Sequence, residues 1–61
     1  MLANKVLSFR VEGIDEDGYN AVVFIEAFDL IGAREAAESK MKAIGKKFSR
    51  IGSVSVLAEN S

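Results

Sequence analysis

The sequence predicts an α+β fold, a two-layer β-β-α-β unit with one helix packed on one face of a three-stranded antiparallel sheet. Residues 5–12, 19–28 and 52–59 show the alternation or β-branched and aromatic content of strands, and residues 29–47 carry apolar side chains at helical spacing. The first two strands are joined as a hairpin. A right-handed helical crossover leaves the second and third strands parallel. The first strand therefore lies in the middle, in the order 2-1-3.

Residues 29–47 are predicted to form the helix that covers the sheet. Asp29 can accept hydrogen bonds from the unpaired N–H groups of the first turn. Gly45 suits the left-handed conformation that commonly follows a helix end. The residues that recur at three- and four-residue spacings on the predicted buried face are Ala33, Ala36, Ala37, Met41 and Ile44. Small alanine side chains let this helix lie close to the sheet.

Alternation in the strands predicts which sheet face the helix covers. Residues 13–18 contain the Asp-Gly pair of a hairpin turn, and Asn60 and Ser61 are expected to form a short tail. Val54, Val56 and Ala58 are expected to share one face of the third strand. The side chains expected to face the helix are Leu7, Phe9, Val23, Ile25, Ala27, Val54 and Val56. The opposite register of residues 19–28 would bury Val22, Phe24 and Phe28 instead, and alternation leaves both registers open.

Length and composition limit the functions that the chain can have. A chain of 61 residues is long enough for one domain, residues 1–61, and no cysteine or histidine is present to supply a disulfide or a nitrogen or sulfur metal ligand. Oligomerisation is the remaining usual source of stability, and no cofactor is predicted. The N-terminus MLANKVLSF lacks a signal-peptide pattern, and no apolar run is long enough to span a membrane. We therefore expect a soluble, cytoplasmic protein.

The best functional clue is the sheet face opposite the helix, because a solvated sheet face is normally polar. The residues predicted to form a partner or dimer interface there are Val6, Arg10, Val22, Phe24 and Leu57. They indicate a non-catalytic, regulatory protein-binding module, a homodimer formed through the sheet face or a sheet edge, with a protein partner that the sequence does not identify. Phe24→Asp is expected to dissolve the oligomer or abolish partner binding while the monomer stays folded.

The alternative is a nucleic-acid- or ribosome-associated protein that uses the basic segment 40–50. The candidate phosphate contacts are Lys42, Lys46, Lys47 and Arg50, with Phe48 nearby to stack on a base. However, the net charge is −1, and the predicted topology brings these cations close to the acidic turn Asp15, Glu16 and Asp17. The sequence therefore favours a solvated helix end over a nucleic-acid site. A third interpretation is a sequence selected for foldability alone.

The sequence contains few residues that could carry out catalysis. Without histidine or cysteine, a nucleophile would be a serine activated by a lysine or a carboxylate, and the serines are scattered with no elbow motif. The turn carboxylates lack the spacing of an EF-hand loop, and the segment 45–47 lacks the upstream glycine of a phosphate-binding loop. We therefore expect no enzyme and no metal site.

The run FIEAFDLIGAREAAESKMKAIG followed by IGSVSVLAE has a recurrent layout of strand, capped alanine-rich helix and Ser-Val-rich strand. This layout resembles that of small accessory proteins of bacteriophages, including some inhibitors of host defence, and that of archaeal ribosomal proteins of the LX type. The resemblance covers most of the chain and carries no shared motif. It implies a small binding protein, and the slightly acidic charge departs from the basic ribosomal type.

Overall fold

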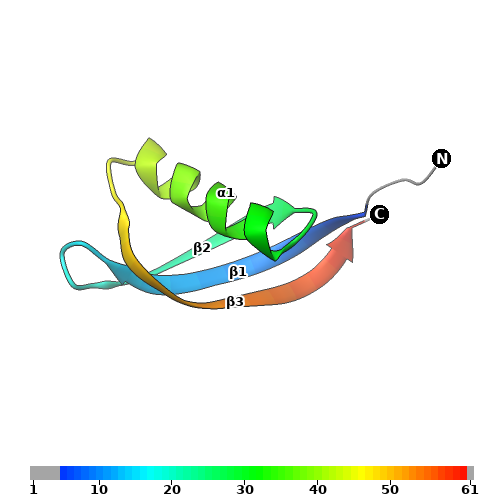
Figure 1. The fold of residues 1–61 in the computed structure, drawn as a ribbon, viewed down its shortest axis with the longest axis horizontal. Coiled ribbons are helices and arrows are strands. Elements are labelled where there is room, and N and C mark those ends of the chain that lie inside the picture. Colours follow the sequence, from blue (N-terminus) through cyan, green and yellow to red (C-terminus); the bar gives the residue numbers. More distant parts are fainter. Residues whose placement is uncertain (1–4, 61) are drawn as a thin grey trace.

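The computed structural model describes residues 5–60, which fold as one sheet covered by one helix (Figure 1). The elements are β1 (Val6–Asp15), β2 (Asn20–Ala27), α1 (Leu30–Ala43) and β3 (Phe48–Asn60). The strand order is β2-β1-β3, and β1 is antiparallel to both neighbours. The predicted fold class and strand order are confirmed. Residues 1–4 and 61, which the single-domain prediction and the predicted tail include, lie outside the described residues.

The hairpin turn is tighter than predicted, because β1 continues to Asp15 and the turn occupies residues 15–18. The Gly18 N–H donates to the Asp15 carbonyl at 3.0 Å, which closes the turn. The buried Asp15 carboxylate also orders the loop, since its Oδ1 atom accepts the N–H groups of Asp17 and Tyr19, both at 2.9 Å. This is the local role that aspartate commonly plays in turns.

The third strand starts four residues earlier than predicted, at Phe48 instead of residue 52. Its pairing with β1 contains three register shifts, between Ser8 and Phe9, Glu12 and Gly13, and Ile14 and Asp15. Such bulges add an unpaired residue and bend the strand. Each shift also reverses the alternation of β3. Ala58 therefore pairs with Ser8 and shares the outer face with it, and the prediction that Ala58 shares a face with Val54 and Val56 is wrong.

A glycine in β1 permits the bend of β3. A Cβ atom at Gly13 would collide with the carbonyl oxygen of Arg50 and would lie 3.0 Å from the Phe48 ring. This close approach carries β3 across the end of β1 and directs Phe48 into the core. The prediction that Gly13 belongs to the turn is therefore wrong, because the residue is needed inside the strand.

The helix is shorter than predicted at its C-terminal end, although its N-cap is as expected. The Asp29 carboxylate accepts the Gly32 N–H at 2.7 Å. At the other end, Gly45 has φ +76, its N–H donates to the Lys42 carbonyl, and the Lys46 N–H donates to the Met41 carbonyl. This Schellman pattern ends the helix at Ala43.

One predicted core residue of the helix is exposed. Ile44 is the C-cap residue, and its side chain is exposed instead of buried. The chain leaves helical geometry at this position, so the helical spacing that predicted burial no longer applies. Phe48, which follows four residues later, contributes the apolar side chain at this end of the core.

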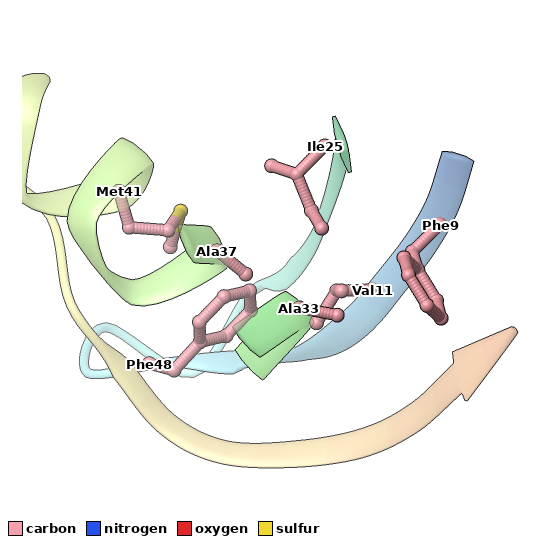
Figure 2. Close-up of a cluster of buried hydrophobic side chains, with 7 residues drawn as sticks. All are labelled: Phe9, Val11, Ile25, Ala33, Ala37, Met41 and Phe48. Atoms are coloured by element: carbon pink, nitrogen blue, oxygen red, sulfur yellow. The ribbon is translucent and has the colours of Figure 1, made fainter. Parts of the chain in front are cut away.

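The core lies between α1 and the sheet (Figure 2). Its buried side chains come from all four elements: Phe9, Val11, Ile25, Ala33, Ala37, Met41 and Phe48. Val23 and Ala27 pack against this cluster, which decides the register that the sequence left open. Val56 shares their face, opposite Phe9, yet is exposed because α1 packs mainly on β2. No helix in the described residues is long and apolar enough to cross a membrane.

We expect Gly13→Ala to lower the free energy of unfolding by about 1–3 kcal/mol or more, because the new methyl group has backbone atoms on two sides. Gly52→Ala is the matched control in the neighbouring strand, since the nearest atom to its Cβ would be the Glu12 carbonyl oxygen at 3.6 Å. Urea unfolding followed by circular dichroism measures both. Equal stability of the two variants would contradict the close approach.

We expect Asp15→Ala to cost about 1–3 kcal/mol of stability, because two backbone N–H groups lose their acceptor. Asparagine keeps an oxygen at the Oδ1 position, so Asp15→Asn should retain most of the stability. Thermal unfolding of the three proteins measures the difference. An equal loss in both variants would show that the carboxylate charge, and not this acceptor, holds the turn.

Candidate protein-binding surface

The face of the sheet opposite α1 is not covered by any element of the described chain (Figure 1). Strand pairing assigns the side chains of this outer face row by row. They are Val6, Ser8, Arg10, Glu12 and Ile14 from β1, Asn20, Val22, Phe24 and Glu26 from β2, and Arg50, Ser53, Ser55 and Ala58 from β3. The β2 side of this face is the more apolar side, and the β3 side is rich in serine.

An ion pair lies at the centre of the outer face. The guanidinium of Arg10 contacts the Glu12 carboxylate at 2.9 Å, and both side chains are partly exposed. Arg10 lies directly opposite Phe24, and Glu12 lies opposite Val22. The Phe24 side chain is 57% exposed, and Val22 is also exposed. Arg10, Val22 and Phe24 therefore form one cluster, which we call the Phe24 patch.

The other two residues predicted for this interface lie outside the Phe24 patch. Val6 is half-buried near the start of β1, where it pairs with Asn60. Leu57 is exposed at the register shift between Ser8 and Phe9, on the far side of β1 from β2. The structure brings three of the five predicted residues together, because the bulge in β3 and the length of β1 separate the rest.

The basic residues at the helix end meet the acidic turn in space, as the topology predicts. Lys42, Lys46 and Lys47 line a hollow of about 380 Å³ together with Asp15, Glu16 and Asp17. The two segments also touch through their backbones, since the Glu16 N–H donates to the Lys47 carbonyl at 3.1 Å. The positive charges of this segment therefore face carboxylates.

The structure separates Arg50 from the other three proposed nucleic-acid contacts. Arg50 pairs with Ile14 on the outer face, whereas the three lysines line a hollow on the other side of the sheet. Phe48 is only 7% exposed and belongs to the core, so the prediction that it could stack on a base is wrong. In a regular strand, Phe48 and Arg50 would lie on the same face. The bulge between Ile14 and Asp15 adds one residue between them, so Phe48 faces the helix and Arg50 lies on the outer face.

A second apolar surface was missed by the sequence analysis. A groove of about 500 Å³ lies between the start of α1 and the end of β3, and we call it the β3 groove. Its lining residues are Leu7, Phe9, Asp29, Leu30, Ile31 and Val56. The sequence offered one signal for this surface. Ile31 precedes Arg34 and Glu38 by three and seven residues, so helical spacing places it on the polar face of the helix. In the structure its side chain is 73% exposed.

Within residues 5–60, no three acidic side chains lie close enough to hold a metal ion. Asp15 is the buried charged residue of this range, and its carboxylate is occupied by two backbone N–H groups of the turn.

No protein-family model, curated protein or solved structure matches this chain. No residue therefore takes a role from a relative. The functional argument rests on the two apolar surfaces described above, the Phe24 patch and the β3 groove.

We expect no measurable binding of single- or double-stranded oligonucleotides at low salt. The lysines face the acidic turn, and Arg50 lies on the other face of the sheet. Fluorescence anisotropy of labelled oligonucleotides tests this, with polylysine as the positive control. Binding that weakens steeply with added salt would contradict the expectation and would support phosphate contacts by this protein.

Proposed function

We propose that the protein is a non-catalytic protein-binding module, a small regulatory or inhibitor protein that recognises its partner with the Phe24 patch. One observation carries the proposal. Phe24 is 57% exposed on the sheet face that no element of residues 5–60 covers (Figure 1). An exposed phenylalanine on a solvated sheet face loses the stabilisation that burial would give it, and that stabilisation becomes available when a partner covers the ring.

The composition of the patch supports binding. Aromatic residues and arginine are enriched among the residues that dominate binding energy at interfaces. Phe24 lies opposite Arg10 on the neighbouring strand, and the adjacent row on the same face contains Val22 and Glu12. An apolar centre beside a polar margin is the usual anatomy of a protein interface.

The patch is also preorganised. It sits on two paired strands whose register is continuous from Leu7 to Ile14, so its side chains need little ordering on binding. The 2.9 Å contact with Glu12 restrains the Arg10 side chain in addition. A suitable partner would offer an apolar pocket for the Phe24 ring and polar groups for the Arg10–Glu12 pair beside it.

The test compares two single substitutions of exposed aromatic residues. Phe24→Thr removes the ring and keeps a residue suited to a strand. Tyr19→Thr removes a ring that is 71% exposed beside the hairpin turn, away from the patch. Tagged versions of the wild type and both variants are used to capture binding proteins from a lysate of the organism that encodes the protein. The affinity of each version for any captured protein is then measured with purified components.

We expect a partner retained by the wild type and by Tyr19→Thr and lost by Phe24→Thr, with a drop in affinity of roughly 30-fold, about 2 kcal/mol. Circular dichroism melts of the variants control for folding. Equal retention by all three proteins, or no specific partner of the wild type, would reject the Phe24 patch as a binding site.

A further inference from the structure

The two edges of the sheet differ in how they are protected. On the β2 edge, the Lys40 ammonium group of α1 donates to the carbonyl oxygen of Phe24 at 2.8 Å. A charged side chain of the helix therefore covers the outer edge of β2 near its middle. β3 is the longer edge strand, with 13 residues, and within the part of the chain that the structure describes no element lies beyond it (Figure 1).

The sequence of β3 lacks two common edge protections. Natural edge strands are often blunted by lysine, proline or bulges. β3 contains neither lysine nor proline, and its three register shifts leave residues 53–56 paired with residues 9–12 without interruption. This regular segment carries only serine and valine. It is the part of the edge best suited to pair with another strand.

The β3 groove lies beside the same edge. Because α1 packs mainly on β2, the helix side of β3 stays open near its end, where Val56 is 55% exposed. Leu30 and Ile31 of α1 form the opposite wall and are also exposed. An open backbone edge and an open apolar groove thus adjoin each other, and one partner could cover both.

We propose that this partner is a second copy of the chain, bound by antiparallel pairing of β3 with β3 across a two-fold axis within residues 53–56. The axis would stand perpendicular to the sheet, so that both helices lie on one side. Val54 and Val56 of one copy then meet Val56 and Val54 of the other between the two grooves. Such a contact is self-complementary and closes as a dimer.

The charges of β3 fit this antiparallel arrangement. Its charged residues are Arg50 near the start and Glu59 near the end. They lie on opposite faces of the sheet, with Arg50 on the outer face and Glu59 on the helix side, where Glu59 contacts Lys5 at 3.1 Å. Antiparallel pairing keeps the two Arg50 residues at opposite ends of the interface, whereas parallel pairing would place like charges together.

The dimer extends the proposed function without depending on it. Pairing at β3 would create a six-stranded sheet with both Phe24 patches on the same face, because the two-fold axis keeps the faces of the two sheets aligned. Such a module would bind a repeated or dimeric partner through two sites at once. Phe24→Thr should leave the dimer intact, so failure of the patch and failure of the dimer can be told apart.

The first experiment is light scattering on the full chain over a range of concentrations. We expect a molar mass twice that of the 6.6 kDa chain, and a melting temperature that rises with concentration. Ser55→Lys places two ammonium groups near the axis and should yield monomers. Asn20→Lys, on the same sheet face but on β2, should leave the mass unchanged.

The second experiment uses the absence of cysteine in the wild type. Opposed positions of antiparallel strands lie within the Cα separation of a disulfide. Mild oxidation of Ser55→Cys should give a covalent dimer in high yield, because position 55 lies opposite its own copy when Val54 meets Val56, and Ser53→Cys and Asn20→Cys should not. A monomeric wild type at all concentrations would overturn the proposal. So would a dimer that resists Ser55→Lys, or one that cross-links through position 20 alone.

Discussion

The close contact between α1 and the sheet is the interaction on which the rest of the structure depends. Ala33 and Ala37 are completely buried against the strands, and their small side chains bring the helix axis near the backbone of β2. Larger side chains fill the two ends of this narrow contact, with Phe9 at one end and Met41 with Phe48 at the other. Because the contact is narrow, it covers β2, the middle of β1 and the start of β3, and leaves the helix side of β3 open around Val56.

The end of the molecule near the hairpin shows how backbone geometry decides which side chains meet. The left-handed Gly45 turns the chain out of α1 and carries Lys46 and Lys47 toward the acidic turn. The close approach at Gly13 then places Phe48 under the helix. The basic segment consequently lies beside the acidic turn, and its aromatic residue, Phe48, is buried in the core.

The two exposed apolar surfaces follow from different features. The Phe24 patch exists because α1 covers one face of the sheet, which leaves alternate side chains of β2 in solvent. The β3 groove exists because the helix is displaced toward β2 on the face that it does cover. One surface is a flat sheet face with a central ion pair, and the other adjoins an open backbone edge. These geometries suit different kinds of contact.

The sequence by itself determined the fold class, the strand order and the N-cap at Asp29, because local periodicity, capping chemistry and crossover handedness act within short stretches of chain. It also favoured the register that exposes Phe24. Alternation alone left the opposite register open, and the burial of Ile25 in the structure excludes that alternative. Only the tertiary structure decided the bulges of β3, the burial of Phe48, the exposure of Ile44 and the groove at Val56. These features depend on how closely two segments that are distant in the sequence approach each other. No periodic pattern within one segment encodes the separation between the two.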